Sequence, residues 1–235
     1  MVLNILKKKK FAIILSGCGG MDGTECHEAI SLMIAIKQAG VNYVCFAVND
    51  YQKHVIHAID KSFENTIDNE KRNMLIESRR LNHGIVYDIK KLSVNQFDAL
   101  IFPGGYGTGI SLSNFIICSN GVCKKNIHYS VRSEIKEIIQ QFNEDGKPIF
   151  AGCMAPVLIN GSLTGVKIMM DAGEYTKHII EKHKNTYKIC NSGEICIDKK
   201  NKIITAPFYM ARKTGVDIIF NESVKSIKEI LKMCD

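Results

Sequence analysis

The segment 152–156, with the sequence GCMAP, combines the residue types of a nucleophilic site. The apolar run 148–151 before it predicts a buried strand, and Pro156 suits the first turn of a helix, where its missing N–H costs nothing. A strand, a sharp turn that carries a nucleophile and a helix together form a nucleophile elbow. Such a turn projects the sulfur of Cys153 out of the sheet, and the helix N-terminus favours its thiolate. We therefore predict that Cys153 is a nucleophile and the most acidic thiol, and that the backbone N–H of Met154 faces a forming oxyanion. The alternative, a small buried cysteine that only fills space, fits this context less well.

A second glycine-rich segment offers further oxyanion donors. The sequence Pro103-Gly104-Gly105 follows the apolar run 98–102, which predicts another buried strand. Glycine lets a backbone N–H approach a substrate closely. We therefore predict that Gly104 and Gly105 bind the substrate or its oxyanion.

A carboxylate is needed to move protons near the nucleophile. Asp22, Glu25 and Glu28 all lie in the segment that links the first strand to the first helix. Glu28 falls inside the first helical turns, from which its side chain can point back over the sheet edge. Each of the three also fits a simpler role as a negative charge at a helix N-terminus. The spacing alone leaves the choice open.

Alternating strands and helices must position these residues. Continuous apolar runs predict strands at 11–15, 44–48, 98–102 and 148–151, with shorter ones at 166–170 and 203–204. Helical spacing predicts helices at 25–38, 131–142 and 223–233, and a charged helical insertion covers 65–80. This order is typical of an α/β fold with a mostly parallel sheet, whose chemistry lies beyond the carboxyl ends of the strands. The loops 16–23, 103–109 and 152–156 follow strand ends and are therefore where the chemistry is expected, whereas 113–128 has no regular pattern.

Composition restricts the class of protein. The chain has 235 residues, 46% hydrophobic and 23% charged, which predicts one globular domain over 11–235 behind a flexible basic tail, 1–10. No apolar run approaches the ~20 residues of a membrane span, so we expect no membrane contact. Four lysines of the tail supply much of the net charge of +7, and Lys far outnumbers Arg, which argues against a nucleic-acid partner. Nine cysteines, an odd number without a CxxC pair, indicate reduced thiols in the cytoplasm, with a mitochondrial location as the weaker alternative.

Cofactor sites are not indicated. The glycine-rich loops at 17–19 and 105–107 lack the third glycine of a dinucleotide fingerprint, and Gly146-Lys147 lacks the earlier glycine of a phosphate loop. No His and Cys spacing matches a paired metal-ligand motif. We therefore expect neither a cofactor nor a metal.

With these residues in place, the chain resembles the ThiJ/PfpI superfamily, which is related to class I glutamine amidotransferases, and within it the ElbB branch of enhancing lycopene biosynthesis proteins and glyoxalases. The resembling segments are SGCG at 16–19, DG at 22–23, HEA at 27–29, RNMLIE at 72–77, PGGYG at 103–107, LSNF at 112–115, GKP at 146–148, CMAP at 153–156 and NKIIT at 201–205 with Pro207. The RNMLIE and LSNF segments are specific to the branch, whereas PGG and CxxP are general to the superfamily.

The resemblance implies a flavodoxin-like three-layer α/β/α sandwich, assembled as a homodimer. It also implies that Cys153 is the nucleophile, Glu28 the adjacent carboxylate, and Gly105 and Met154 the oxyanion donors. Some relatives carry a histidine directly after the nucleophile, where this chain has Met154, and others supply one from the strand after the elbow helix, where 166–171 has none. Protease or amidotransferase chemistry through a Cys–His–acid triad is therefore not evident.

A Cys–Glu pair suits a proton shuttle at an aldehyde. By resemblance, the thiolate of Cys153 would add to methylglyoxal or glyoxal, Glu28 would move a proton from one carbon to the neighbouring oxygen, and water would release a hydroxy acid. This is cofactor-independent glyoxalase III-type chemistry on a small reactive aldehyde. Two other functions stay open: a redox or carbonyl-stress sensor that acts through Cys153, and a non-catalytic regulatory module of isoprenoid metabolism.

Overall fold

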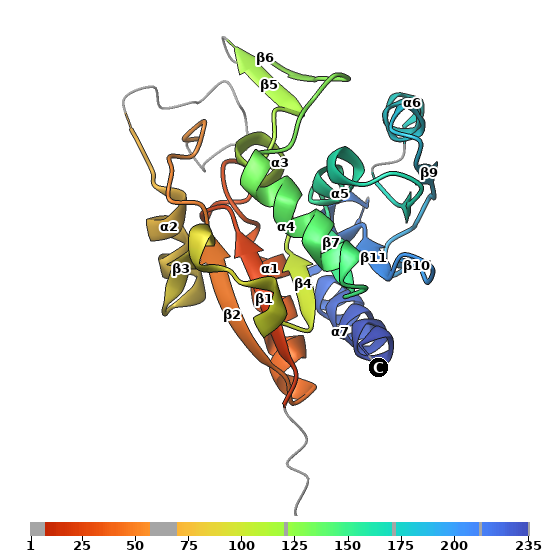
Figure 1. The fold of residues 1–235 in the computed structure, drawn as a ribbon. Helices are drawn as coiled ribbons and strands as arrows, with labels where there is room; N and C mark the ends of the chain where they lie inside the picture. Colours follow the sequence, from red (N-terminus) through yellow and green to blue (C-terminus); the bar gives the residue numbers. More distant parts are fainter. Residues whose placement is uncertain (1–7, 57–69, 120–121, 171–172, 212, 235) are drawn as a thin grey trace, which may run out of the picture.

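A seven-stranded sheet forms the centre of the computed structural model, which describes residues 8–56, 70–119, 122–170, 173–211 and 213–234 (Figure 1). The strand order is β10-β11-β7-β4-β1-β2-β3. In that order the strands span Cys196–Asp198, Ile203–Ala206, Ile149–Gly152, Ala99–Phe102, Lys10–Leu15, Asn42–Ala47 and Val86–Asp88. Neighbours are parallel except β10, which pairs antiparallel with β11. The predicted mostly parallel sheet is confirmed.

The central strands are buried on both faces, as their continuous apolar runs predict. In β1 the five residues that follow Lys10 are all buried, and every residue of β4 and β7 is buried too. Strand β1 lies between β2 and β4, where Ile13 is in register with Cys45 on one side and with Ile101 on the other. Polar residues are therefore confined to the strand ends.

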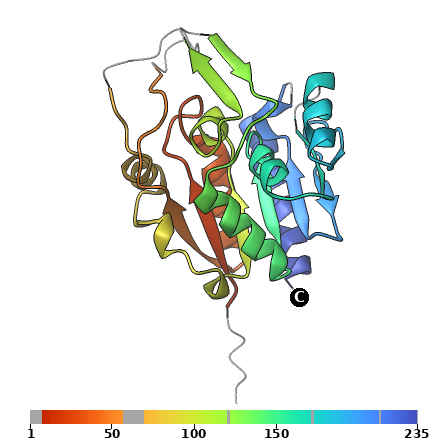
Figure 2. The ribbon, with the colours of Figure 1, turned by 45° about the horizontal axis from the view of Figure 1, so that its top comes forward.

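Helices cover both faces of this sheet. They span Cys26–Gln38 (α1), Met74–Asn82 (α2), Tyr106–Ser111 (α3), Ser133–Glu144 (α4), Pro156–Ser162 (α5), Glu174–Lys182 (α6) and Val216–Met233 (α7), with short 3-10 turns at Ile89–Lys91, Val94–Gln96 and Phe208–Met210. Helices α1 and α7 pack together on one face, and α4 and α5 pack on the other (Figures 1 and 2). The flavodoxin-like three-layer sandwich is thus confirmed.

Several element boundaries differ from the sequence predictions. Helix α7 begins at Val216 rather than at 223, and within 65–80 the described part of the insertion forms α2 from Met74 onward. The stretch 113–128 contains a hairpin of β5 (Ile116–Ser119) and β6 (Val122–Lys125), and a separate small sheet pairs β8 (Lys167–Ile168) with β9 (Thr186–Tyr187). Strand β8 lies within the strand predicted at 166–170, whereas β5, β6 and β9, of two to four residues, are too short for an apolar pattern to reveal.

The N-terminal boundary lies slightly before the predicted one. Residues 1–7 of the predicted tail lie outside the described residues. Lys10 belongs to β1, its N–H donates to Asp98 Oδ2 at 2.7 Å, and the carbonyl of Lys9 accepts from Asn42 N at 3.0 Å. Sheet pairing therefore includes the last two residues of the stretch that was predicted to be a tail.

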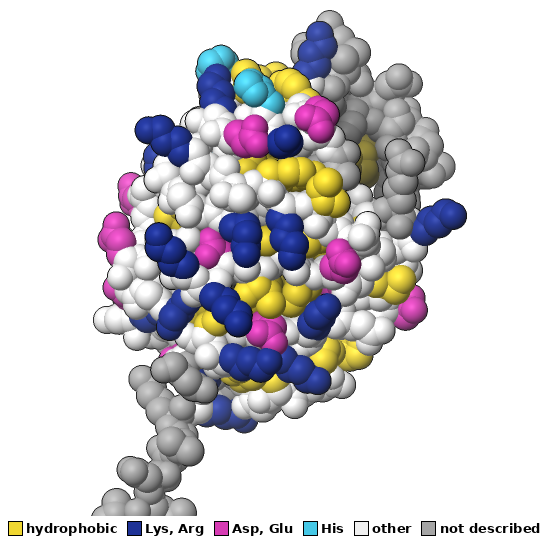
Figure 3. Space-filling model, turned by 90° about the vertical axis from the view of Figure 1, so that its right-hand side faces the viewer, with side chains coloured by type: hydrophobic (Ala, Val, Ile, Leu, Met, Phe, Trp, Pro, Cys, Tyr) yellow, Lys and Arg dark blue, Asp and Glu magenta, His cyan; other side chains and the backbone are white. Residues whose placement is uncertain are grey.

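Surface charges are mixed on the face formed by α6, β9, β10 and α7. Figure 3 shows Lys and Arg side chains dispersed there among acidic and apolar ones rather than gathered in one patch. Among the residues that the structure describes, no helix combines the length and apolar character needed to cross a bilayer.

Candidate active site

The three loops that were predicted to carry chemistry meet at one edge of the sheet. Strands β7, β4 and β1 are direct neighbours and run parallel, so their carboxyl ends lie side by side. The loops 152–156, 103–109 and 16–23 follow these ends. Strand β11, on the other side of β7, adds a fourth segment, Pro207 to Tyr209.

The turn at Cys153 has the geometry of a nucleophile elbow. Its φ is +50°, a left-handed conformation that non-glycine residues rarely adopt and that is common at functional sites. The N–H of Cys153 donates to the carbonyl of Ala206 at 2.9 Å, and Pro156 stands in the first turn of α5 as predicted. Gly152 is required before the turn, because a Cβ there would lie 2.5 Å from the ring of Phe208.

The carboxyl of Glu28 is fully buried beside the elbow. Its Oε2 accepts from the N–H of Gly104 at 2.9 Å, its Oε1 accepts from the N–H of Tyr209 at 3.4 Å, and the thiol of Cys153 donates to the carboxylate. The contacts leave no space beside Gly104, where an added Cβ would overlap Cys153 Cβ and lie 2.7 Å from Glu28 Oε2. The structure thus brings Cys153, Glu28 and Gly104 together.

Two of the three predicted oxyanion donors, Gly105 and Met154, converge on the sulfur, whereas the N–H of Gly104 is directed at Glu28 Oε2. The backbone N–H groups of Gly105 and Met154 both donate to Cys153 Sγ. Gly105 has a φ of +106°, and a Cβ on it would lie 2.7 Å from the backbone nitrogen of Glu25, so only glycine fits this turn. An oxygen that forms on a carbon bound to the sulfur would find these donors nearby.

The prediction that Cys153 is the most acidic thiol is wrong. Burial raises the pKa of the Cys153 thiol well above its ordinary value, and the negative charge of Glu28 raises it further. These effects outweigh the N–H donors of Gly105 and Met154, which act in the opposite direction. The pKa of Cys26 is instead lowered to about 7.

Burial also raises the pKa of Glu28, to about 8. The charge of Glu25 adds to this rise, and the hydrogen bonds from Cys153, Tyr209 and Gly104 oppose it. At neutral pH the carboxyl therefore exchanges readily between its acid and its base form, which is the property of a proton shuttle.

The other two carboxylates have different partners. Asp22 Oδ2 accepts from the N–H of Ile56 at 2.9 Å, which ties the first loop to a later one. Glu25 caps α1 by accepting from Glu28 N at 2.8 Å, and its Oε1 lies 3.2 Å from His27 Nδ1. Of the three candidates, only Glu28 lies against the nucleophile.

Residues that the sequence reasoning missed hold the site in place. Tyr209 donates its N–H to Glu28, and its hydroxyl lies 3.1 Å from His27 Nδ1. The buried hydroxyl of Ser16 lies 3.1 Å from Thr24 Oγ1 and 2.8 Å from Thr108 Oγ1. Thr108 donates to the carbonyl of Gly104 at 3.0 Å, so this hydroxyl chain links the first loop to the oxyanion segment. In the sequence, these contacts are indicated only by small hydroxyl residues in the segments that follow the strands, namely Ser16, Thr24 and Thr108.

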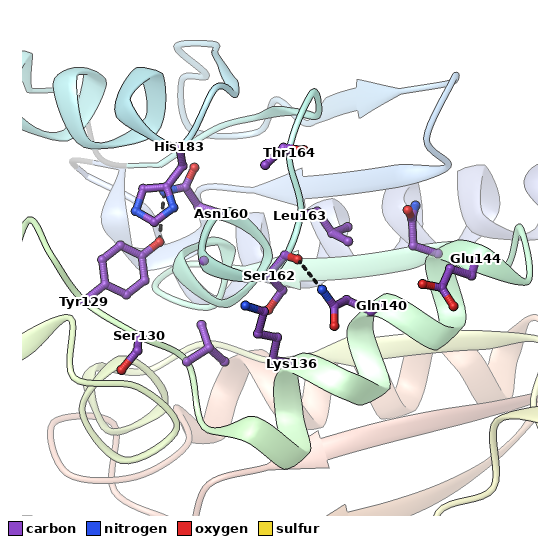
Figure 4. A pocket seen from close by; sticks show the side chains of 13 residues that line it. Tyr129, Ser130, Lys136, Gln140, Glu144, Asn160, Ser162, Leu163, Thr164 and His183 are labelled. Atoms are coloured by element: carbon purple, nitrogen blue, oxygen red, sulfur yellow. Dashed lines mark hydrogen bonds between the residues drawn. The ribbon is translucent and has the colours of Figure 1, made fainter.

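A cavity of about 610 Å³ lies elsewhere, between α4 and the C-terminal end of α5 (Figure 4). Its lining is polar and includes Lys136 and Glu144 from α4, the buried amide of Asn160, and His183. It contains none of the predicted site residues, because Cys153 precedes the opposite end of α5. Among the described residues, no group of three or more His, Cys, Asp or Glu side chains forms a potential metal site.

Comparison with known proteins places this geometry in a family. No model of a known protein family matches the chain. It is 32% identical to the human "Glutamine amidotransferase-like class 1 domain-containing protein 3, mitochondrial" over 233 residues, which cover 95% of this chain and 83% of the human protein. It is 31% identical to the rat "ES1 protein homolog, mitochondrial", with 96% of this chain and 84% of the rat protein covered.

Solved structures show the same relationship. An isoprenoid biosynthesis protein with an amidotransferase-like domain from Ehrlichia chaffeensis superposes with a TM-score of 0.82 at 30% identity, covering 97% of this chain and all of that one. DJ-1beta from Drosophila melanogaster shares the fold, with a TM-score of 0.52 at 15% identity and coverage of 96% and 95%. The chain therefore belongs to the class I glutamine amidotransferase-like domain proteins, and it shares the fold of DJ-1.

Proposed function

We propose that the protein is a cofactor-independent glyoxalase III-type enzyme that converts methylglyoxal or glyoxal to a hydroxy acid through a hemithioacetal on Cys153. The observation that supports it most directly is the buried contact between Cys153 and Glu28, with two backbone N–H groups aimed at the sulfur. Together these groups provide a nucleophile, a proton carrier and an oxyanion site in direct contact with one another.

The first step is addition of the sulfur to the aldehyde. Because the thiol keeps its proton, the Glu28 carboxylate takes that proton as Sγ bonds to the aldehyde carbon. The N–H groups of Gly105 and Met154 stabilise the oxyanion, which then receives the proton and completes the hemithioacetal. Glu28 is again a carboxylate.

The second step moves hydrogen between the two carbons. Glu28 removes the proton from the former aldehyde carbon, and the electron pair passes through an enediol to the neighbouring carbonyl. A proton then returns to the second carbon while the hydroxyl on the first carbon loses its proton, which leaves a thioester on Cys153. Water cleaves the thioester, which releases lactate from methylglyoxal or glycolate from glyoxal and restores the thiol. Atoms balance as aldehyde plus water to hydroxy acid.

The burial of the site favours a small substrate. Cys153 is 6% exposed and Glu28 is 0% exposed. Because so little of either side chain is exposed, a two- or three-carbon aldehyde needs less rearrangement of the surrounding loops than a peptide would. The pKa of Glu28, about 8, gives the carboxyl access to both protonation states near neutral pH.

Lactate formation from methylglyoxal is the first test. The wild type should produce lactate, and Cys153→Ala should abolish it. Cys45→Ala serves as the matched control, since Cys45 is also buried but lies within β2. Absence of turnover in the wild type, or equal turnover in Cys153→Ala, would refute the proposal.

A second test separates the carboxylates. Proton transfer by a positioned group contributes about 10²–10⁴-fold, so Glu28→Gln should lower turnover at least ~100-fold. Single-turnover mass spectrometry should show that Glu28→Gln forms the Cys153 adduct slowly, because no base takes the thiol proton, and does not release it, whereas Glu25→Gln should form and release the adduct. The reverse pattern would assign the shuttle to Glu25.

A non-catalytic role in isoprenoid biosynthesis is the second candidate, favoured by the similarity to the Ehrlichia isoprenoid biosynthesis protein. A protein that binds partners of that metabolism but yields no lactate would support it. A sensor acting through Cys153 is less favoured, because a thiol of raised pKa is oxidised slowly.

We further propose a homodimer located in the cytoplasm. The names of the human and rat relatives favour the mitochondrial alternative. Imaging of the tagged full chain in its own cell distinguishes the two compartments.

A further inference from the structure

Two cysteines outside the proposed catalytic pair lie sulfur to sulfur. Cys18 is in the loop after β1, and Cys26 is the first residue of α1. Their Sγ atoms are 3.5 Å apart, both are free thiols and both are only partly buried. A disulfide has an S–S length of about 2.05 Å, so the two sulfurs need to approach by only ~1.5 Å.

We propose that Cys18 and Cys26 form a peroxide-oxidisable dithiol that closes reversibly into a disulfide. This modification site is separate from the proposed turnover at Cys153 and does not depend on it. The substrate class is a hydroperoxide, with hydrogen peroxide as its simplest member, and a small dithiol reverses the reaction.

The two cysteines have different roles in this reaction. The pKa of Cys26 is lowered to about 7, first by the hydrogen bond from the Cys18 thiol and also by the backbone N–H of Gly19 and by His27. Cys18 has a raised pKa because of the same hydrogen bond and burial, so it retains its proton. Cys26 is therefore the attacking thiolate, and Cys18 is the resolving thiol.

The reaction balances in two steps. The Cys26 thiolate attacks one peroxide oxygen, the O–O bond breaks, and a sulfenic acid forms while hydroxide leaves and is protonated to water. The Cys18 sulfur then attacks the Cys26 sulfur, the S–OH bond breaks, and the Cys18 proton leaves with the hydroxyl as a second water. Two thiols lose two electrons, and one peroxide gains them.

Glycines surround Cys18 in the loop after β1. Gly17, Gly19 and Gly20 flank it with φ values of +95°, +139° and +71°, so the backbone there is built from residues of low steric restriction. Helix α1 holds Cys26 in a regular turn, and backbone hydrogen bonds such as Gly19 N to Thr24 O at 3.2 Å hold the loop beside it. The ~1.5 Å approach of the two sulfurs therefore falls mainly to rotation of the two side chains.

A second thiol pair in the chain provides an internal comparison. Cys190 and Cys196 are also hydrogen-bonded to each other, and the pKa of Cys196 is likewise lowered to about 7. Cys196 is however 0% exposed, whereas Cys26 is partly exposed. If access to peroxide decides the rate, the Cys18–Cys26 pair oxidises first.

Peptide mapping tests the proposal on the intact wild-type chain. Cleavage after Lys10 and Lys37 places Cys18 and Cys26 in one peptide, and cleavage after Lys188 and Lys199 places the comparison pair in another. After graded hydrogen peroxide and alkylation of free thiols, the 11–37 peptide should be unalkylated and lighter by two hydrogens. It should appear before the same change in the 189–199 peptide, and dithiothreitol should reverse it.

Two variants assign the roles. In Cys18→Ser the Cys26 sulfenic acid should persist and be trapped by dimedone, whereas Cys26→Ser should leave Cys18 reduced. The proposal is overturned if the wild-type 11–37 peptide stays reduced while 189–199 is crosslinked, or if Cys26 advances to sulfinic acid without a crosslink. Glyoxalase turnover does not enter these measurements, so failure of that function leaves the result unaffected.

Discussion

Replacing Glu28 by Gln should make the protein more stable than the wild type, and the difference should grow as the pH rises. In the folded protein, burial raises the pKa of this carboxyl from 4.5 to about 8. Below pH 4.5 both the folded and the unfolded chain carry the proton. Between 4.5 and 8 the unfolded chain releases the proton and the folded chain keeps it, so the free energy of unfolding of the wild type falls with rising pH. Above 8 the loss is complete.

The size of the effect follows from that interval. Each pH unit corresponds to about 1.4 kcal/mol, so the ionised carboxylate costs the fold about 5 kcal/mol above pH 8. Gln has nearly the same shape as the protonated acid and keeps an acceptor for the N–H of Gly104. We expect Glu28→Gln to match the wild type near pH 5 and to exceed its stability by several kcal/mol at pH 9.

Urea unfolding at pH 5, 6, 7, 8 and 9 measures this difference directly. Glu144→Gln, at an exposed position of α4, controls for the loss of one carboxylate. If the free energies of unfolding of the wild type and Glu28→Gln differ by the same amount at every pH, the raised pKa of Glu28 is refuted. A variant less stable than the wild type at pH 9 would show that the hydrogen bonds of the carboxylate outweigh its desolvation.

Further outcomes are expected. Gly104→Ala should lose activity and about 1–3 kcal/mol of stability, because the added Cβ overlaps Cys153 and approaches Glu28. Gly173→Ala, where the added Cβ meets open space, should be tolerated. Activity assays and thermal unfolding measure both variants. Turnover should survive EDTA, and a loss that zinc restores would reveal a metal site. Removal of residues 1–8 should leave the melting temperature unchanged, and a misfolded product would contradict the tail prediction. Sedimentation velocity should give a dimer, and a monomer at high concentration would exclude it.

The sequence by itself determined the central strands and the elbow. Buried parallel strands need apolar residues on both faces, so the runs around Ile13, Ile101 and Phe150 predict them directly. The elbow is local as well, because Gly152 and Pro156 bracket Cys153 within one turn. Since parallel strands end at the same edge, the sequence also indicates that the three loops lie at one edge of the sheet, but their adjacency depends on the order β7-β4-β1, which the structure gives.

The short hairpin β5–β6 and the early start of α7 were decided by tertiary packing. Strands of a few residues have no periodicity to read, and the first turns of α7 are helical because the rest of that helix packs on α1. Neither signal is present in the local sequence.

The choice of Glu28 among three carboxylates, and every pKa, also required the structure. Asp22, Glu25 and Glu28 are alike in sequence, and only the direction of α1 against β4 and β7 places one of them on the sulfur. The acidity order of the thiols reversed for a similar reason. At Cys153 the helix N-terminus favours the thiolate, but burial beside a carboxylate raises the pKa of the thiol and outweighs that local effect. At Cys26 a contact with Cys18 across a loop lowers the pKa of the thiol. Desolvation depends on the neighbours from every layer of the protein, and no window of sequence contains them.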